Sequence, residues 1–169
     1  MTVYPEYGPA RVRGKVNVRW LLYHSDPRFY QPGDRFWTWD ERYGGDKLLR
    51  HSVVSDAFYA DDRPREGFCW YGRKESVHVE GGIDLRSLPL GDKDALAEVM
   101  RSSEYLYCPE MSLIETEAAL CGCPVEKELD WSMEQAVAFR DVLVARHRED
   151  CERGMARVKA FADECLALL

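Results

Sequence analysis

The stretch from Glu104 to Val125 constrains the fold of this chain more than any other part of it. Its first five residues alternate apolar and polar or aromatic side chains and predict a β-strand. Ser112 is followed three residues later by Glu115, and this capping-box spacing predicts that a helix begins there. Gly122 is suited to the left-handed position that ends such a helix, and the residues after it predict another strand. A strand, a helix and a strand with short connections build a parallel sheet.

Two further helical patterns flank this stretch. The residues from Asp92 to Arg101 carry their apolar side chains on one helical face. Ser132 and Gln135 form a second capping box, which opens a helical tract that runs through the rest of the sequence. Gly154 and the polar run from Arg146 to Asp150 are candidate breaks, which would divide this tract into two helices.

The first third of the chain shows short strand patterns and no helical pattern between them. Val16 to Tyr23, Arg35 to Trp39 and Leu48 to Val54 are rich in β-branched or aromatic residues and are bounded by turn formers. The polar segment from Ala60 to Glu66 contains a proline and predicts a linker or a crossing between lobes. The run from Gly67 to Gly72 then predicts a buried strand.

Together these patterns predict an α/β fold, with a largely parallel, Rossmann-like sheet followed by a helical C-terminal tract. We expect a strand-rich segment over residues 1–60 and a Rossmann-like domain with the C-terminal helices over residues 61–169. In such sheets ligands bind at the carboxyl ends of the strands, where the N-termini of the following helices also point.

The turn before the helix that Ser112 opens is therefore the candidate ligand site. Backbone N–H groups at a helix N-terminus suit an anion such as a diphosphate. The residues that would present them are Glu110, Met111, Ser112 and Leu113. Glu117 lies one turn further on, where its carboxylate would accept hydrogen bonds from ribose hydroxyls. The plain alternative is that Ser112 only caps the helix and that Glu117 is solvated.

Composition excludes several classes of protein. The net charge is −7 and the acidic and basic residues are interleaved, which argues against a nucleic-acid partner. No apolar run approaches the roughly 18–20 residues that cross a bilayer, and the N-terminal residues lack a signal-peptide core, so we expect a cytoplasmic chain without a transmembrane segment. The six cysteines are scattered, which predicts reduced, mostly buried thiols and no metal site.

The residues from Glu117 to Val125, EAALCGCPV, resemble the EA-x-x-CG-x-PV signature of GT-B glycosyltransferases of the family 4 (group 1) type. In that family the signature glutamate binds the donor ribose, and Glu117 takes its position. The resemblance implies that the chain contains a C-terminal, donor-binding lobe. It also implies a nucleotide-diphosphate sugar, a UDP- or GDP-sugar, as donor substrate, with no cofactor or metal required.

Weaker likenesses extend over most of the chain. Val3 to Glu6, followed by Val18 to Leu22, resembles the late part of the acceptor-binding lobe in bacterial polysaccharide-type glycosyltransferases. Gly67 to Lys74 resembles the first strand of the donor lobe, whose end carries basic residues for the diphosphate. Arg73 and Lys74 match that place, and their alternative interpretation is a pair of exposed charges.

Two main functions remain open. The first is a glycosyltransferase, or one lobe of it, that transfers a sugar to a glycan-type acceptor in polysaccharide biosynthesis; any general base would come from the acceptor lobe, so no catalytic residue is assigned. The second is a non-catalytic GT-B-like module that acts through a protein partner or as a homo-oligomer. It is suggested by Pro109, which stands where the family often has an acid. A third, thiol-based or metal protein would use Cys108, Cys121 and Cys123.

Overall fold

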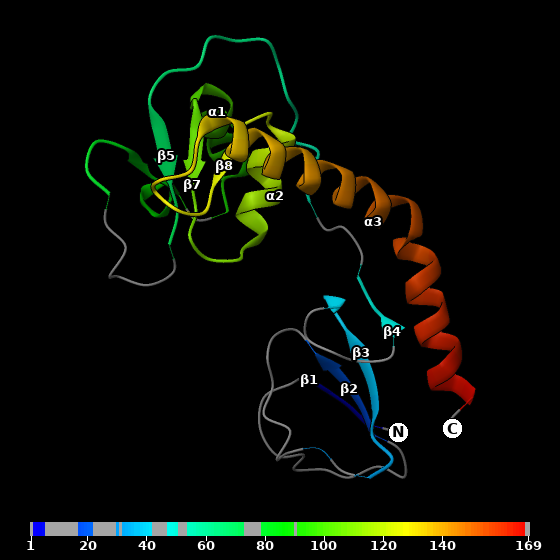
Figure 1. The fold of residues 1–169 in the computed structure, drawn as a ribbon. Helices are drawn as coiled ribbons and strands as arrows, with labels where there is room; N and C mark the ends of the chain where they lie inside the picture. Colours follow the sequence, from blue (N-terminus) through cyan, green and yellow to red (C-terminus); the bar gives the residue numbers. More distant parts are fainter. Residues whose placement is uncertain are drawn as a thin grey trace. The chain divides into compact units, whose positions relative to one another are not determined.

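The computed structural model describes residues 2–5, 17–21, 30, 32–41, 47–50, 54–72, 79–89 and 91–167 of the chain. It has the predicted α/β architecture, with parallel, Rossmann-like sheets and a long C-terminal helix (Figure 1). The chain forms two compact units. Unit 1 consists of Met1–Ser52 and Glu149–Leu169, and unit 2 is Val53–Arg148.

Unit 1 contains a parallel sheet of four strands in the order β1-β2-β3-β4. The strands are β1 (Thr2–Pro5), β2 (Asn17–Leu21), β3 (Arg35–Thr38) and β4 (Lys47–Leu48). Three of them lie within or next to the predicted segments, whereas β1 was not predicted. The buried side chains of Val18 and Trp37 pack against the end of the C-terminal helix, where the rings of Trp37 and Phe161 meet edge to face with centroids 5.1 Å apart.

Unit 2 contains the second sheet, again with four parallel strands, in the order β6-β5-β7-β8. Its elements are β5 (Phe68–Trp70), β6 (Ile83–Asp84), the short 3-10 helix η3 (Leu85–Ser87), α1 (Lys93–Ser102), β7 (Tyr105–Tyr107), α2 (Leu113–Leu120) and β8 (Val125–Glu126). The first strand, β5, lies between the second and the third. The strand order therefore reverses at β5, which is where doubly wound sheets bind ligands.

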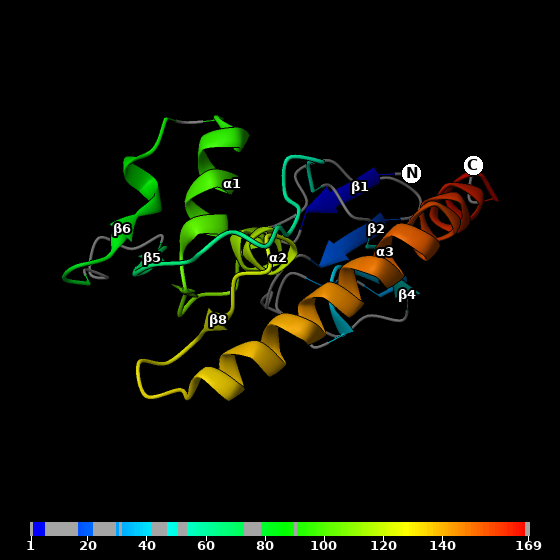
Figure 2. The same cartoon turned by 90° about the horizontal axis from the view of Figure 1, so that it is seen from above.

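The hydrophobic core of unit 2 lies on one face of this sheet. Cys69, Leu106 and Val125 are neighbours in register and are fully buried on that face. Figure 2 shows α1 and α2 on the same side of the strands, and their alanines complete the core. On the other face the rings of Phe68 and Tyr105 stack with their centroids 5.1 Å apart. The predicted alternation of Tyr105 and Tyr107 with Leu106 is thus confirmed.

Helix α2 begins and ends as the sequence predicts. Ser112 is its N-cap, and the Ser112 hydroxyl accepts a hydrogen bond of 3.4 Å from the N–H of Ile114. At the other end Gly122 has a φ of +73° and donates to the carbonyl of Ala119, while the N–H of Cys123 donates to the carbonyl of Ala118, both at 2.9 Å. These two bonds form a Schellman motif. The carboxylate of Glu115, predicted to reach back to the cap, instead forms an ion pair with Lys127.

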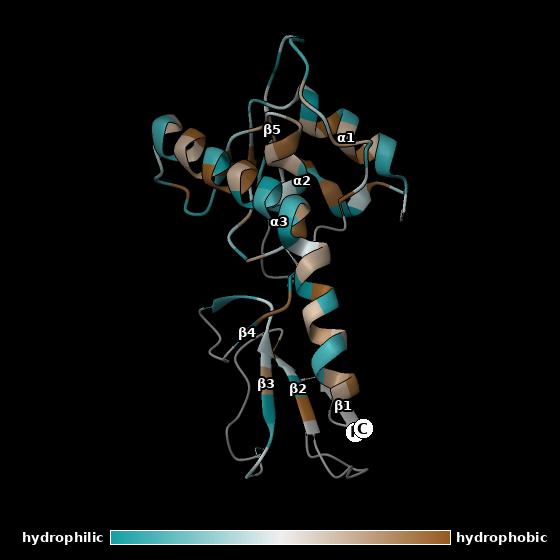
Figure 3. Cartoon of the chain, turned by 90° about the vertical axis from the view of Figure 1, so that its right-hand side faces the viewer, coloured by the Kyte–Doolittle hydropathy of each residue, from teal (hydrophilic) through white to brown (hydrophobic). Residues whose placement is uncertain are grey.

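Helix α3 (Met133–Ala167) is a single helix, so neither candidate break divides the tract. Its capping box is confirmed, because the N–H of Ser132 donates to Gln135 Oε1 at 2.8 Å and the N–H of Gln135 donates to Ser132 Oγ at 3.2 Å. Hydrophobic and hydrophilic residues are interspersed along it (Figure 3). A glycine in a helix interior costs only about 1 kcal/mol, and at Gly154 packing offsets this cost because the residue is buried. Within the described part of the chain, no helix is long and apolar enough to cross a membrane.

The segment predicted as a linker is fixed to unit 2. Just before it, Phe58 is buried in the core of that unit. Arg65 donates hydrogen bonds to the carbonyl oxygens of Met100 (3.1 Å), Ser103 (3.0 Å) and Cys121 (2.7 Å). One guanidinium thus binds the carboxyl ends of both α1 and α2, where a cation is favourable. The compact unit accordingly starts at Val53, and Glu149–Leu169 groups with the first unit, which differs from the division at residue 60.

Candidate functional site

A pocket of about 280 Å³ lies at the carboxyl ends of β5 and β6. Tyr71 directly follows β5, Leu85 directly follows β6, and Lys93 begins α1. The lining residues are Tyr71, Leu85, Arg86, Leu88, Pro89, Gly91, Asp92, Lys93, Leu96 and Ile114. The pocket therefore occupies the edge of the parallel sheet at which ligands bind in this type of fold.

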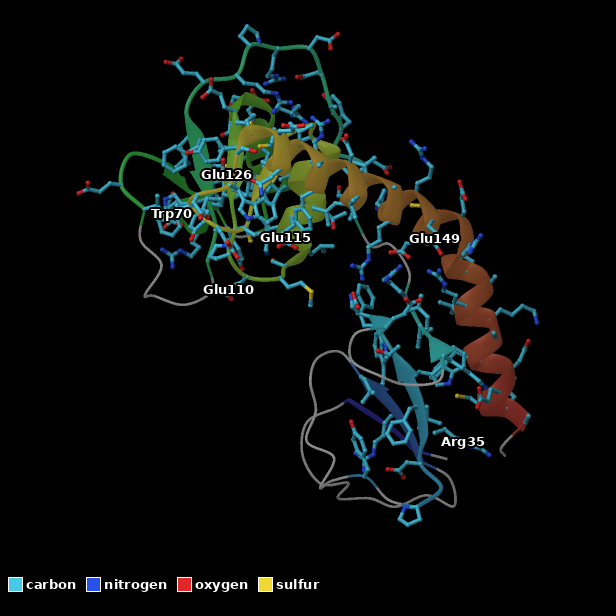
Figure 4. The ribbon with its side chains drawn as sticks, viewed as in Figure 1. Arg35, Trp70, Glu110, Glu115, Glu126 and Glu149 are labelled. Atoms are coloured by element: carbon cyan, nitrogen blue, oxygen red, sulfur yellow. The ribbon has the colours of Figure 1, made fainter. Side chains whose placement is uncertain are left out.

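The pocket has mostly apolar walls and a few charged groups, which is typical of sites for small molecules. The guanidinium of Arg86 is held firmly. Its Nε and Nη2 donate to the carboxylate of Asp84 at 2.9 and 2.8 Å, its Nη1 donates to the carbonyl of Gly72 at 3.2 Å, and it lies 4.6 Å from the ring centroid of Trp70, which Figure 4 labels. Arg86 is thus a fixed cation at the pocket wall.

Glu117 lies behind this wall and is 1% exposed. Its Oε1 accepts a hydrogen bond of 3.0 Å from the Nζ of Lys93. Its Oε2 is buried and has no hydrogen-bond partner among the described residues. The side chain of Lys93 is 47% exposed, lines the pocket, and places Nζ 5.5 Å from the ring centroid of Phe58. The ion pair therefore joins a buried carboxylate to the pocket, and Glu117 is not the solvated helix residue of the plain alternative.

The four residues of the predicted anion-binding turn lie together at the carboxyl end of β7. Met111 and Leu113 are exposed, and Ser112 caps α2. The carbonyl of Glu110 accepts a hydrogen bond of 2.6 Å from the Nζ of Lys127, and Figure 4 shows Glu110 near Glu115. The pocket lining includes the next residue, Ile114, but not these four. Two other predicted site residues, Arg73 and Lys74, lie outside the described residues.

Three charged residues at this edge of the sheet were missed by the sequence analysis: Arg86, Lys93 and Glu126. The clearest is Glu126, at the end of β8, which is 8% exposed and lies opposite Tyr107 in register. Burial raises the pKa of its carboxyl above the usual value. The available signal was an acid at the carboxyl end of a strand that the sequence had already predicted.

We expect Glu126→Gln to stabilise the protein at neutral pH. Because the pKa of Glu126 is raised in the folded state, ionisation favours the unfolded state. The gain in the free energy of unfolding is absent below the unfolded-state pKa of about 4.3. It grows as the pH rises from there to the folded-state pKa, and above that pKa it stays constant. Its size should stay within about 1 kcal/mol. Urea unfolding across this pH range measures the difference in free energy of unfolding between the variant and the wild type, with the exposed Glu128→Gln as control. If this difference became smaller as the pH rises, the assignment would be contradicted.

Two of the buried thiols, those of Cys108 and Cys121, are poor nucleophiles. Burial raises the pKa of Cys108 to about 12 and that of Cys121 to about 11. Both therefore stay protonated at neutral pH, whereas the thiolate is the reactive form. Among the described residues no group of three or more His, Cys, Asp or Glu side chains is arranged to hold a metal ion. The thiols of Cys108 and Cys121 therefore do not support the thiol-based alternative.

No protein-family model matches this chain, and neither a curated protein nor a solved structure matches it. An assignment of function therefore depends on the residues of the pocket and on the chemistry that they offer. The pocket lining combines apolar walls with the charged residues Arg86, Asp92 and Lys93. Lys93 connects it to the buried carboxylate of Glu117, whose Oε2 has no partner among the described residues.

Proposed function

We propose that unit 2 is the donor-binding lobe of a glycosyltransferase and that its pocket binds a nucleotide-diphosphate sugar, with UDP- and GDP-sugars as the expected donors. The observation that carries this proposal is the buried carboxylate of Glu117 beside the pocket, with Oε2 unpartnered. The signature-like stretch from Glu117 to Val125 supports it, because Glu117 stands at the position of the family's ribose-binding glutamate.

The physical argument starts from the cost of an unpartnered buried oxygen. A buried polar atom without a hydrogen bond is unfavourable, and most such atoms in folded proteins have a partner. A ligand that brings hydroxyl donors to Glu117 recovers this energy. Ribose offers two adjacent hydroxyls, and the apolar walls beside Tyr71 suit the flat face of a base.

The pocket edge also suits the charge of a diphosphate. Lys93 lies at the N-terminus of α1, and Ile114 lies at that of α2, where helix dipoles favour an anion. Arg86 lies fixed at the same wall, with its charge paired to Asp84. Catalysis would then depend on stabilising the negative charge of the leaving diphosphate, while the general base would come from the acceptor lobe.

We expect Glu117→Gln to weaken binding of UDP or GDP and of their sugars by about 10- to 100-fold, because a hydrogen bond to a charged group contributes about 1.5–3 kcal/mol. Titration calorimetry measures this change. The matched control is Glu128→Gln, which replaces an exposed glutamate outside the pocket lining. The proposal fails if the wild type binds none of these nucleotides, or if Glu117→Gln binds them as tightly as the wild type does.

A second function is favoured by one observation on α3. Three apolar side chains are exposed along one face of this helix: Met155, Val158 and Leu166. They are separated by three and by eight residues in the sequence. Exposed stripes of this kind serve as seams between chains. A non-catalytic assembly module would use this stripe. Light scattering together with a donor-hydrolysis assay separates the two functions, because a tight oligomer without hydrolysis supports the module.

A further inference from the structure

The ion pair between Lys93 and Glu117 is unevenly buried. The side chain of Lys93 is 47% exposed, whereas that of Glu117 is only 2% exposed. Lys93 lines the pocket and Glu117 does not, so Lys93 stands between the pocket and Oε1 of the carboxylate. A ligand that approaches Glu117 from the pocket must therefore displace Lys93 or pass beside it.

The two partners lose unequal amounts when the pair opens. Glu117 becomes a buried charge without a counter-ion, which is strongly unfavourable. Lys93 returns to solvent at little cost, because its ammonium sits on a flexible four-carbon stem. Opening is therefore favourable only if the incoming ligand supplies hydrogen-bond donors to the carboxylate of Glu117.

The released ammonium also needs a partner if the exchange is to be efficient. Arg86 is held by Asp84 and by the carbonyl of Gly72, so it does not take over the position of Lys93 beside Glu117. An anionic group of the ligand in the pocket would accept the ammonium of Lys93. Hydroxyl donation to Glu117 thus favours the release of Lys93, and binding of the Lys93 ammonium by the anionic group favours access to Glu117.

From this geometry we propose that Lys93 is a charge gate that determines the specificity of the pocket. The gate opens to ligands that carry hydroxyl donors and an anionic group together, and it disfavours ligands that carry only one of the two. A neutral nucleoside offers no anion to Lys93, so the ammonium of Lys93 competes with the ligand's hydroxyls for Oε1 of Glu117. Inorganic pyrophosphate attracts Lys93 but offers no hydroxyl donor, so Glu117 is left without a partner. The inference rests on the proposed role of the pocket as a nucleotide site.

The first test needs no ligand. Lys93→Met should lower the midpoint of thermal unfolding, because it leaves the charge of Glu117 buried and unpaired. Adding Glu117→Gln to Lys93→Met should restore most of the loss, since the second change removes that charge. The control is Lys159→Met, at a lysine whose side chain is 76% exposed, and it should shift the midpoint little. Equal midpoints for Lys93→Met and Lys159→Met would overturn the gate.

The second test compares UDP with uridine and inorganic pyrophosphate, and GDP with guanosine, by calorimetry. The wild type should bind the nucleoside diphosphate at least about 10-fold more tightly than the nucleoside or pyrophosphate. In Lys93→Met the affinity for the diphosphate should fall by about 10-fold or more, toward that of the nucleoside. A variant that binds UDP and GDP like the wild type overturns the gate alone. A wild type that binds neither nucleotide overturns the proposed function and the gate with it.

Discussion

Asp150→Ala is expected to lower the free energy of unfolding by about 3 kcal/mol or more, because it leaves a buried cation without its counter-ion. The carboxylate of Asp150 accepts hydrogen bonds from Arg50 Nε at 2.7 Å and from Arg157 Nη1 at 2.8 Å. These three side chains are 10–15% exposed. Arg157 keeps an ion pair with Glu149 at 2.8 Å, so the uncompensated charge is mainly that of Arg50.

Urea unfolding of the whole chain measures this loss. The matched control is Asp163→Ala, because Asp163 lies on the same helix and pairs with Lys159, but both side chains are more than half exposed. Exposed pairs contribute little, so this control should unfold almost like the wild type. Asp150→Asn keeps an acceptor oxygen and should fall between the two. Equal losses for Asp150→Ala and Asp163→Ala would show that the buried cluster contributes no more than an exposed pair.

Gly122→Ala should be the most damaging change at the end of α2, with an expected loss of about 2–4 kcal/mol. Two costs combine. The φ of +73° is unfavourable for any residue with a Cβ, by about 1–2 kcal/mol. The new Cβ would also lie 3.0 Å from Arg65 Nη2 and 3.1 Å from the Cβ of Ala60, and such crowding typically costs another 1–3 kcal/mol or so.

A second glycine separates these two costs. Gly81 also has a positive φ, +83°, but no atom lies within 4 Å of the position where its Cβ would be. Gly81→Ala should therefore show the backbone cost alone, in the same thermal or urea unfolding experiment. In an Arg65→Ala background, the additional loss caused by Gly122→Ala should shrink, because one of the crowding atoms is gone. Equal losses at Gly81 and Gly122 would contradict the crowding argument.

Local patterns were sufficient to predict most elements of unit 2. The strand at Tyr105–Tyr107, the start of α2 at Ser112 and its end at Gly122 each depend on residues within one or two turns. Capping residues and glycines with positive φ act through their own backbone and their nearest neighbours. For that reason a short window of sequence contains the information that determines them.

The candidate site was only partly predictable, because it depends on packing between distant segments. Glu117 was identified from the sequence, but its partner Lys93 lies 24 residues away on another helix. By itself Lys93 has the pattern of a solvated residue in a first helical turn. Arg65 was likewise assigned to a linker, although it binds the ends of two helices. In each case the tertiary contact, and not the local pattern, determines the role.

The predicted break in α3 was wrong for the opposite reason, because a local sequence signal was given too much weight against tertiary contacts. Gly154 and the charged run before it suggested a break. In the structure, Glu149 and Asp150 of that run form ion pairs, and Asp150 is buried between Arg50 and Arg157. Such contacts outweigh a helix propensity penalty of about 1 kcal/mol.

The smallest side chains of α2 constrain how this protein can evolve. Ala118 and Ala119 are 0% and 2% exposed, and both lie in the core shared by α2 and the sheet. Larger side chains at these two positions would have to displace their neighbours, because protein interiors are close-packed. We expect a valine at either place to shift α2 and to disturb the ion pair between Glu117 and Lys93. Selection on ligand affinity would then act on residues that never touch a ligand, and sequence drift at this layer should be confined to glycine, alanine and serine.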